Sequence, residues 1–162
     1  MKLKNEINFI EKNVKYPEKG LPDDIFFFIG RMTPFINVDL LLKCSKNGTL
    51  LTWREDKITG NGWHIPGGII RFKEKIGKRI SEVGKSELGI LIKNFNGPIA
   101  VNEIITNLKQ RSHFISLLFE CELSKNEKKI LLQIVKKNKK IKFFKKAPKN
   151  LLKWHKIYKN YI

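Results

Sequence analysis

The sequence has few cysteines and no long apolar run. Cys44 and Cys121 each lie in an apolar, strand-like stretch and lack the spacing of metal-binding motifs, so we expect reduced, packed thiols and no structural zinc site. No run approaches the roughly eighteen apolar residues that span a membrane. The residues that follow Met1 lack the apolar segment of a signal peptide, so a cytoplasmic protein is expected.

Acidic residues are also scarce, with 15 Asp plus Glu against 33 Lys plus Arg and a net charge of +18. Such a balance is typical of nucleic-acid-binding proteins. Most of the positive charge is lysine, however, spread along a chain rich in Asn and Ile, which indicates compositional drift. Bidentate phosphate recognition favours arginine, so the few arginines, such as Arg31 and Arg54, are more informative. Nucleic acid is therefore not expected as the main partner.

The length of 162 residues suits a single domain, 1–162, and the pattern of elements is that of an α/β protein. Apolar spacing predicts a helix over 3–15, and the continuous apolar run 25–29 predicts a buried strand. Strands 35–44 and 50–53 are expected to pair across the turn at 45–48, and 97–108 with 112–123. A capping box at Ser124 predicts a helix, which a strand over 141–144 and a C-terminal helix from Pro148 follow. The expected fold is a mixed sheet flanked by helices.

Residues 62–92 organise the rest of the chain. They predict a strand ending at Pro66, a turn at Gly67 and Gly68, a helix over 75–87 and a stop at Gly89. On the helical wheel, Ile80, Val83 and Glu87 lie within roughly 40° of Ile76, so a carboxylate occupies the apolar face. A buried Glu needs a salt bridge, a raised pKa or a bound cation. The accessible carbonyls of a Gly-Gly turn favour the cation, with Glu87 and the Gly67 carbonyl holding Mg²⁺.

This stretch resembles a Nudix box, through Gly68, Glu74, Glu87, Gly89 and Ile90 at the spacings of that motif. It departs where Glu82 replaces an Arg, Val83 and Ser86 replace metal-binding Glu residues, and Gly84 replaces an aliphatic residue. The resemblance implies a Nudix α/β/α sandwich with a mixed sheet, and a Mg²⁺-dependent hydrolase.

Within the Nudix family, the chain is most similar to GDP-mannose mannosyl hydrolases, which also keep the last Glu of the box. Thr33-Pro34, Asp39, Arg54, Trp63 and Pro66 match that branch. The resemblance implies a nucleoside diphosphate sugar such as GDP-mannose as substrate, with Glu87 and Arg54 catalytic and with Asp39, Arg54 and Arg31 contacting the substrate. For Asp39, hydrogen bonding within the fold is an equally weighted alternative.

The general base is not identified by the resemblance. The branch uses a His in the loop before the last strand, where this chain has Asn138. His64, Glu55 and Glu103 are alternatives, and His113 is more readily a hydrogen-bonded core residue. Two other functions stay open: conventional Nudix pyrophosphohydrolysis, which cuts the P–O–P linkage, and a catalytically weak nucleotide-binding or RNA-binding protein. The N-terminal arm, 1–30, is the expected contact of a homodimer.

Overall fold

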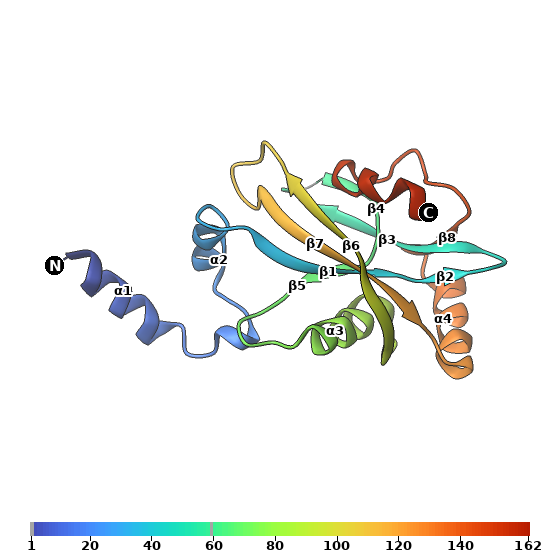
Figure 1. Ribbon diagram of the computed structural model, residues 1–162, viewed down its shortest axis with the longest axis horizontal. Coiled ribbons are helices and arrows are strands. Elements are labelled where there is room, and N and C mark those ends of the chain that lie inside the picture. The colour runs from blue at the N-terminus through green and yellow to red at the C-terminus, as the bar shows by residue number, and fades with distance from the viewer. Residues whose placement is uncertain (1, 59) are drawn as a thin grey trace.

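The computed structural model describes residues 2–58 and 60–162, and its two small sheets lie among helices (Figure 1). The N-terminal region comprises α1 (Lys2–Asn13), the 3-10 helix η1 (Pro17–Lys19) and α2 (Asp23–Ile29). The strands and helices that follow are β1 (Phe35–Leu41), β2 (Lys43–Cys44), β3 (Gly48–Asp56), β4 (Gly60–His64), β5 (Gly67–Ile69), α3 (Ile76–Leu88), β6 (Asn94–Ile105), β7 (His113–Glu122), α4 (Lys125–Lys137), β8 (Ile141–Phe144) and the 3-10 helix η2 (Lys153–Tyr161).

The central sheet is mixed, as the sequence predicts. Its strand order is β5-β1-β7-β6, with β1 and β7 parallel and the two outer pairs antiparallel. The second sheet has the order β2-β3-β4, and β8 also pairs with β3. The parallel pair β1–β7 places two strands that are far apart in sequence side by side, while β5 returns the chain from the second sheet to the edge of the first.

Helices cover both faces of these sheets. Leu40 and Leu50 pack in one buried cluster with Ile80 of α3 and Leu131 of α4. Their neighbours Leu41 and Leu51 pack in a second cluster with residues of the C-terminal segment, Leu151 and Tyr158. Successive strand residues point to opposite faces, so the two clusters are the two interfaces of an α/β/α sandwich. None of the helices in residues 2–58 and 60–162 is long and apolar enough to cross a membrane.

Several local predictions are confirmed. Helix α3 ends at Gly89, whose left-handed backbone (φ 66°) places its N–H against the Gly84 and Lys85 carbonyls. The capping box at Ser124 is formed, with Ser124 Oγ accepting from the Glu127 N–H and the Glu127 carboxylate accepting from the Ser124 N–H. Strands β6 and β7 pair antiparallel, β8 forms, and both cysteines are free thiols.

Other predictions are wrong. The run 25–29 is helix α2, not a strand: Asp23 and Asp24 lie in its first turn, where carboxylates favour the helix dipole, and Phe26 stacks on Phe35 at 4.7 Å. Strand β1 pairs with β5 and β7 in the central sheet, so the hairpin across 45–48 is confined to β2 and β3. The C-terminal element is a 3-10 helix that begins later than predicted.

Gly67 and Gly68 also differ from the prediction, because they lie in β5 rather than in a turn. Gly67 pairs with Asp39 of β1, and a Cβ at Gly67 would collide with Asp39 Oδ1 and with the Val38 carbonyl. The close approach of the two strands, rather than a turn conformation, therefore requires glycine at position 67.

A buried carboxylate holds the C-terminal segment to the central sheet. Asp39 of β1 is 2% exposed. Its Oδ2 accepts hydrogen bonds from Ser116 Oγ of β7 and Tyr158 OH of η2, and its Oδ1 accepts from Asn37 Nδ2 at 3.0 Å. A buried carboxylate needs such donors, since an unsatisfied one is costly. Asp39 thereby fixes η2 over this face of the sheet.

Replacing Tyr158 by Phe should lower the free energy of unfolding by about 1–3 kcal/mol, because it removes one donor from the buried Asp39 carboxylate. Urea denaturation of both proteins measures the difference. Tyr161→Phe, in the same helix but only partly buried, is the matched control and should cost less. Equal losses in the two variants would contradict the role given to the Asp39 contact.

Candidate functional site

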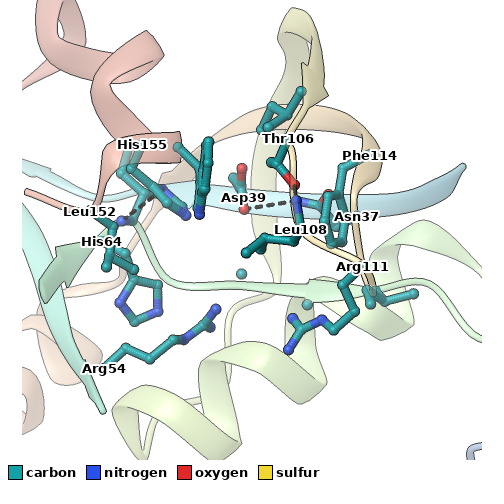
Figure 2. Close-up of a pocket in the computed structure, with 16 residues that line it drawn as sticks. Asn37, Asp39, Arg54, His64, Thr106, Leu108, Arg111, Phe114, Leu152 and His155 are labelled. Atoms are coloured by element: carbon teal, nitrogen blue, oxygen red, sulfur yellow. Dashed lines mark hydrogen bonds between the residues drawn. The ribbon is translucent and has the colours of Figure 1, made fainter. Parts of the chain in front are cut away.

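Arg54 and His64 stand between two cavities. An inner cavity of about 160 Å³ is lined by Asn37, Asp39, Arg111, Phe114 and His155 together with Arg54 and His64. An outer cleft of about 340 Å³ is lined by Thr52, Glu87, Asn138 and Lys140, again with Arg54 and His64. Arg54 lies in β3 and His64 lies in the neighbouring strand β4. The two strands pair antiparallel, with Arg54 opposite Gly62. Figure 2 shows the inner cavity.

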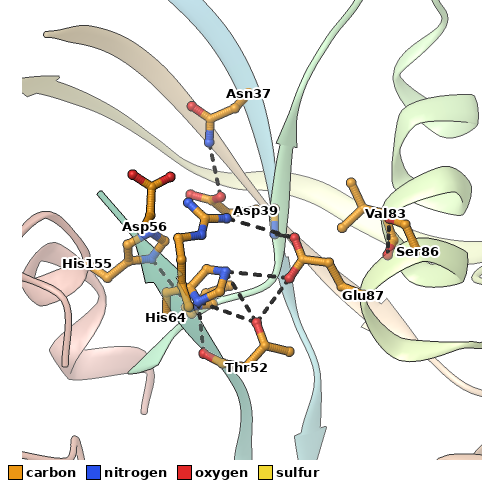
Figure 3. Close-up of polar contacts among 12 residues, drawn as sticks. Asn37, Asp39, Thr52, Asp56, His64, Val83, Ser86, Glu87 and His155 are labelled. Atoms are coloured by element: carbon orange, nitrogen blue, oxygen red, sulfur yellow. Dashed lines mark hydrogen bonds and ion pairs between the residues drawn. The ribbon is translucent and has the colours of Figure 1, made fainter. Parts of the chain in front are cut away.

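The carboxylate of Glu87 is the centre of a polar network at the cleft (Figure 3). Its Oε2 accepts from Thr52 Oγ1 at 3.0 Å and lies 3.5 Å from His64 Nε2. Its Oε1 accepts from the Gly67 N–H at 3.3 Å and lies 4.0 Å from Arg54 Nη2. The predicted carboxylate on the apolar side of the helix is therefore matched by donors from three strands.

These contacts set the ionisation of Glu87. Burial alone would raise the pKa of this carboxyl. The hydrogen bond and charge of protonated His64, the charge of Arg54 and the hydrogen bond from Thr52 outweigh burial, so the pKa of Glu87 lies below its ordinary value. Glu87 is thus a carboxylate at neutral pH. The sequence left a salt bridge, a raised pKa or a bound cation as the ways to accommodate it, and the structure contains ion pairs with Arg54 and His64.

The network does not fit a resident Mg²⁺. Each oxygen of Glu87 already faces a protein donor and a basic side chain, and the group of Gly67 that contacts Glu87 is its N–H. Among residues 2–58 and 60–162, no cluster of three or more His, Cys, Asp or Glu side chains could hold a metal ion. Magnesium prefers several oxygen ligands, and these contacts supply none that is free. A metal held by Glu87 and the Gly67 carbonyl therefore stays a prediction.

His64 is held in one tautomer. Its Nδ1 lies 2.8 Å from the Thr52 carbonyl, which can only accept, so Nδ1 carries the proton. Nε2 lies 3.5 Å from the Glu87 carboxylate; in the protonated ring it donates to Glu87, and only in the neutral ring can it accept a proton. Of the three alternative general bases, His64 lines both cavities, whereas Glu55 and Glu103 line neither. Glu55 bonds Lys140 and Trp53, and Glu103 bonds His113.

The remaining predicted residues have mixed positions. Asp39 lines the inner cavity, but its donors are those of a structural carboxylate; burial raises its pKa above the ordinary value despite the hydrogen bonds from Ser116 and Tyr158. Arg31 is exposed in the turn after α2 and is not among the side chains that line the two cavities. Glu82 pairs with Lys85 at 3.0 Å on the surface.

Glu74 of the box secures the loop ahead of α3. Both of its oxygens accept from Arg79, at 2.7 Å from Nε and 2.9 Å from Nη2, and Oε2 also accepts from the Arg71 N–H at 3.0 Å. This buried fork-to-carboxylate pair fixes the loop against the helix that carries Glu87.

Two residues of the inner cavity were not expected from the sequence. Arg111 lies in the connection between β6 and β7, where the sequence indicates only a hairpin turn. His155 of η2 lies near the ring of His64, with centroids 5.5 Å apart, and burial together with the charges of His64 and Arg54 holds its pKa well below the ordinary value. Spacing gives no signal for either residue, because each reaches the cavity through the long-range packing of its element.

Known structures share this architecture. NrtR from Shewanella oneidensis matches with a TM-score of 0.57 and 14% identity, over 76% of this chain and 59% of NrtR. A MutT Nudix hydrolase from Burkholderia pseudomallei matches with a TM-score of 0.50 and 15% identity, over 63% of this chain and 98% of that protein. No protein-family model and no curated protein matches the sequence. At these identities the likeness shows the fold: the chain has the Nudix fold.

Replacing Glu87 by Gln should lower the free energy of unfolding at pH 7 by about 1–3 kcal/mol, because the charged partner of Arg54 and His64 is lost. A carboxyl whose pKa is depressed on folding stabilises the folded state above its unfolded pKa and loses that effect as pH falls through the folded pKa. The gap between wild type and variant should therefore shrink on acidification below the ordinary Glu range. Denaturation across pH tests this.

The matched control for Glu87→Gln is Glu82→Gln, which removes an exposed carboxylate from the same helix. It should change stability by a few tenths of a kcal/mol at most, as expected for a surface ion pair. A Glu87→Gln variant as stable as this control at pH 7 would contradict the network described here.

Proposed function

We propose that the protein is a hydrolase of a nucleoside diphosphate derivative, with a nucleoside diphosphate sugar such as GDP-mannose as substrate. The observation that carries the proposal is the position of Arg54 at the junction of the two cavities. A guanidinium there can hold the diphosphate by paired hydrogen bonds. The organic groups on either side of the diphosphate then extend one into each cavity.

The sizes of the cavities support a ligand in two parts. A volume of about 160 Å³ is close to that of a cavity that accepts one benzene-sized ring. The inner cavity alone is too small for a complete nucleotide sugar. Phe114 and Trp154 line the inner cavity and offer apolar faces to a ring, while Glu87, Lys140 and Asn138 make the cleft polar.

In the proposed reaction, the oxygen of water attacks the sugar carbon and the C–O bond to the diphosphate breaks. The nucleoside diphosphate leaves with the bonding electrons. His64 Nε2 takes a proton from the attacking water, and Glu87, 3.5 Å away, stabilises the imidazolium that forms. Cleavage at carbon agrees with the box, because Val83 and Ser86 stand where the motif has two of its acidic residues.

The resemblance implies magnesium, but the contacts of Glu87 leave it no ligand set, so no step of the proposed reaction uses the ion and the assay is run with and without it. Two alternatives give different products. Cleavage of the P–O–P linkage would yield a nucleoside monophosphate, and a catalytically weak nucleotide-binding or RNA-binding protein would give little product of either kind.

Incubation with GDP-mannose in ¹⁸O-labelled water should place the label in free mannose and leave GDP unlabelled. His64→Gln should lower the rate by a factor of about 10²–10⁴, the usual contribution of a general base. Mass spectrometry of the products measures both. Glu103→Gln, which alters a surface carboxylate bonded to His113, is the control and should keep the wild-type rate. Label in a nucleotide or sugar phosphate would mean attack at phosphorus and would exclude the proposed reaction.

We also propose that the protein forms a homodimer through α1. Figure 1 shows α1 extending away from the sheets, and no residue within it is buried. Leu3 and Ile7, which lie one turn apart on the same side of the helix, are 70% and 47% exposed. A helix that leaves such residues in water is stabilised little by its own chain. A second copy, related by a two-fold axis, would cover the helix with an equivalent apolar face.

Light scattering should report twice the monomer mass of 19.0 kDa for the wild type and the monomer mass for a Leu3→Ser/Ile7→Ser variant. A Lys4→Ser/Lys12→Ser variant changes two exposed polar positions of the same helix and should stay dimeric. A wild-type protein that is monomeric at micromolar concentration would exclude the dimer.

A further inference from the structure

Arg111 occupies an unusual position for an arginine. It lies in the connection between β6 and β7 with a left-handed backbone (φ 53°), a conformation that costs free energy in any residue with a side chain. Its guanidinium is only partly exposed and lines the inner cavity together with Arg54. Figure 2 shows the Arg54 and Arg111 side chains extending toward each other. The fold thus places two permanent cations at one small space.

The protein compensates Arg111 incompletely. Its Nη1 lies 3.5 Å from Asp56 Oδ2, a long contact for an ion pair, and its Nε is buried without a hydrogen-bond partner in residues 2–58 and 60–162. Its guanidinium carbon also lies 6.0 Å and 5.9 Å from the ring centres of Phe26 and Phe114. Buried donors are nearly always satisfied, so the orphaned N–H indicates a place for an acceptor that the chain itself does not supply.

The charges agree with this geometry. Burial, and next the positive charge of Arg54, lower the pKa of Arg111 from its ordinary value, while Asp56 acts in the opposite direction. The two guanidinium groups therefore repel each other in the free protein. An anion placed between them would remove this repulsion and fill the unsatisfied donor at the same time.

We propose that Arg54 and Arg111 together form a binding site for a diphosphate group, and that this site needs no divalent cation. The inference rests on the proposed function, since it names the residues that hold the diphosphate of the same ligand. Each guanidinium presents a planar set of N–H donors that matches phosphate oxygens. Two of them neutralise a diphosphate in the way that a metal ion otherwise does.

The same geometry predicts selectivity by phosphate number. A ligand with two linked phosphates can engage both guanidinium groups at once, whereas a monophosphate leaves one of them without its anion. Inorganic pyrophosphate and a nucleoside diphosphate should therefore bind more tightly than inorganic phosphate and the matching nucleoside monophosphate.

Titration calorimetry of the full chain in EDTA tests the proposal, with inorganic pyrophosphate, GDP, phosphate and GMP as ligands. Pyrophosphate and GDP should bind without added metal. Arg111→Gln should weaken both by about 10- to 100-fold, the loss expected for charge-assisted hydrogen bonds. Arg111→Lys keeps the positive charge but loses the planar set of N–H donors, so its affinity should lie between those of the wild type and Arg111→Gln. Arg71→Gln, at an exposed arginine outside both cavities, should bind as wild type does.

Thermal unfolding separates binding from a structural role. Without ligand, Arg111→Gln should melt at or above the wild-type temperature because the repulsion from Arg54 is gone. With pyrophosphate, it should lose most of the stabilisation that the wild type gains. Binding that requires Mg²⁺, or an unchanged dissociation constant in Arg111→Gln and Arg111→Lys, would overturn the proposal. These measurements involve no turnover, so they stand whether or not GDP-mannose is hydrolysed.

Discussion

The carboxylate of Glu87 connects the main parts of the structure. Its donors come from β3 and β4 of the second sheet and from β5 of the central sheet, while Glu87 itself belongs to α3. A half-buried carboxylate is stable only if such donors are in place. The helix can therefore dock in one position along its axis, and this position brings Arg54 and His64 to the boundary between the two cavities. The docking position of α3 therefore determines both the ion pair of Glu87 and the placement of Arg54 and His64 at the cavities.

Local patterns predicted the elements whose signals lie within a few residues. The helical spacing from Ile76 to Glu87, the glycine stop at Gly89 and the capping box at Ser124 depend on neighbours one turn away, and the structure confirms all three. The prediction of a strand over 25–29 was wrong for a related reason. Continuous apolar residues fit a buried strand or a buried helix equally well, and the deciding features were two aspartates in the first turn and a contact with Phe35.

The site was predicted in part. Glu87 was recognisable because a carboxylate on an apolar helical face is costly, but its partners lie 20 to 35 residues away along the chain, as the separations of Gly67 and Thr52 show. Arg111 and His155 approach the cavity from the β6–β7 connection and from η2, which the buried Asp39 holds in place through Tyr158. No spacing rule connects such residues before the sheet order is known.

The contact between Arg54 and Glu87 makes the two kinds of ligand interdependent. A guanidinium that turns toward a phosphate leaves Glu87 Oε1 with less compensation for its charge. That oxygen then attracts a cation more strongly than it does in the free protein. By thermodynamic linkage, an anion that takes Arg54 raises the affinity of Glu87 for a cation, and the cation raises the affinity for the anion by the same factor.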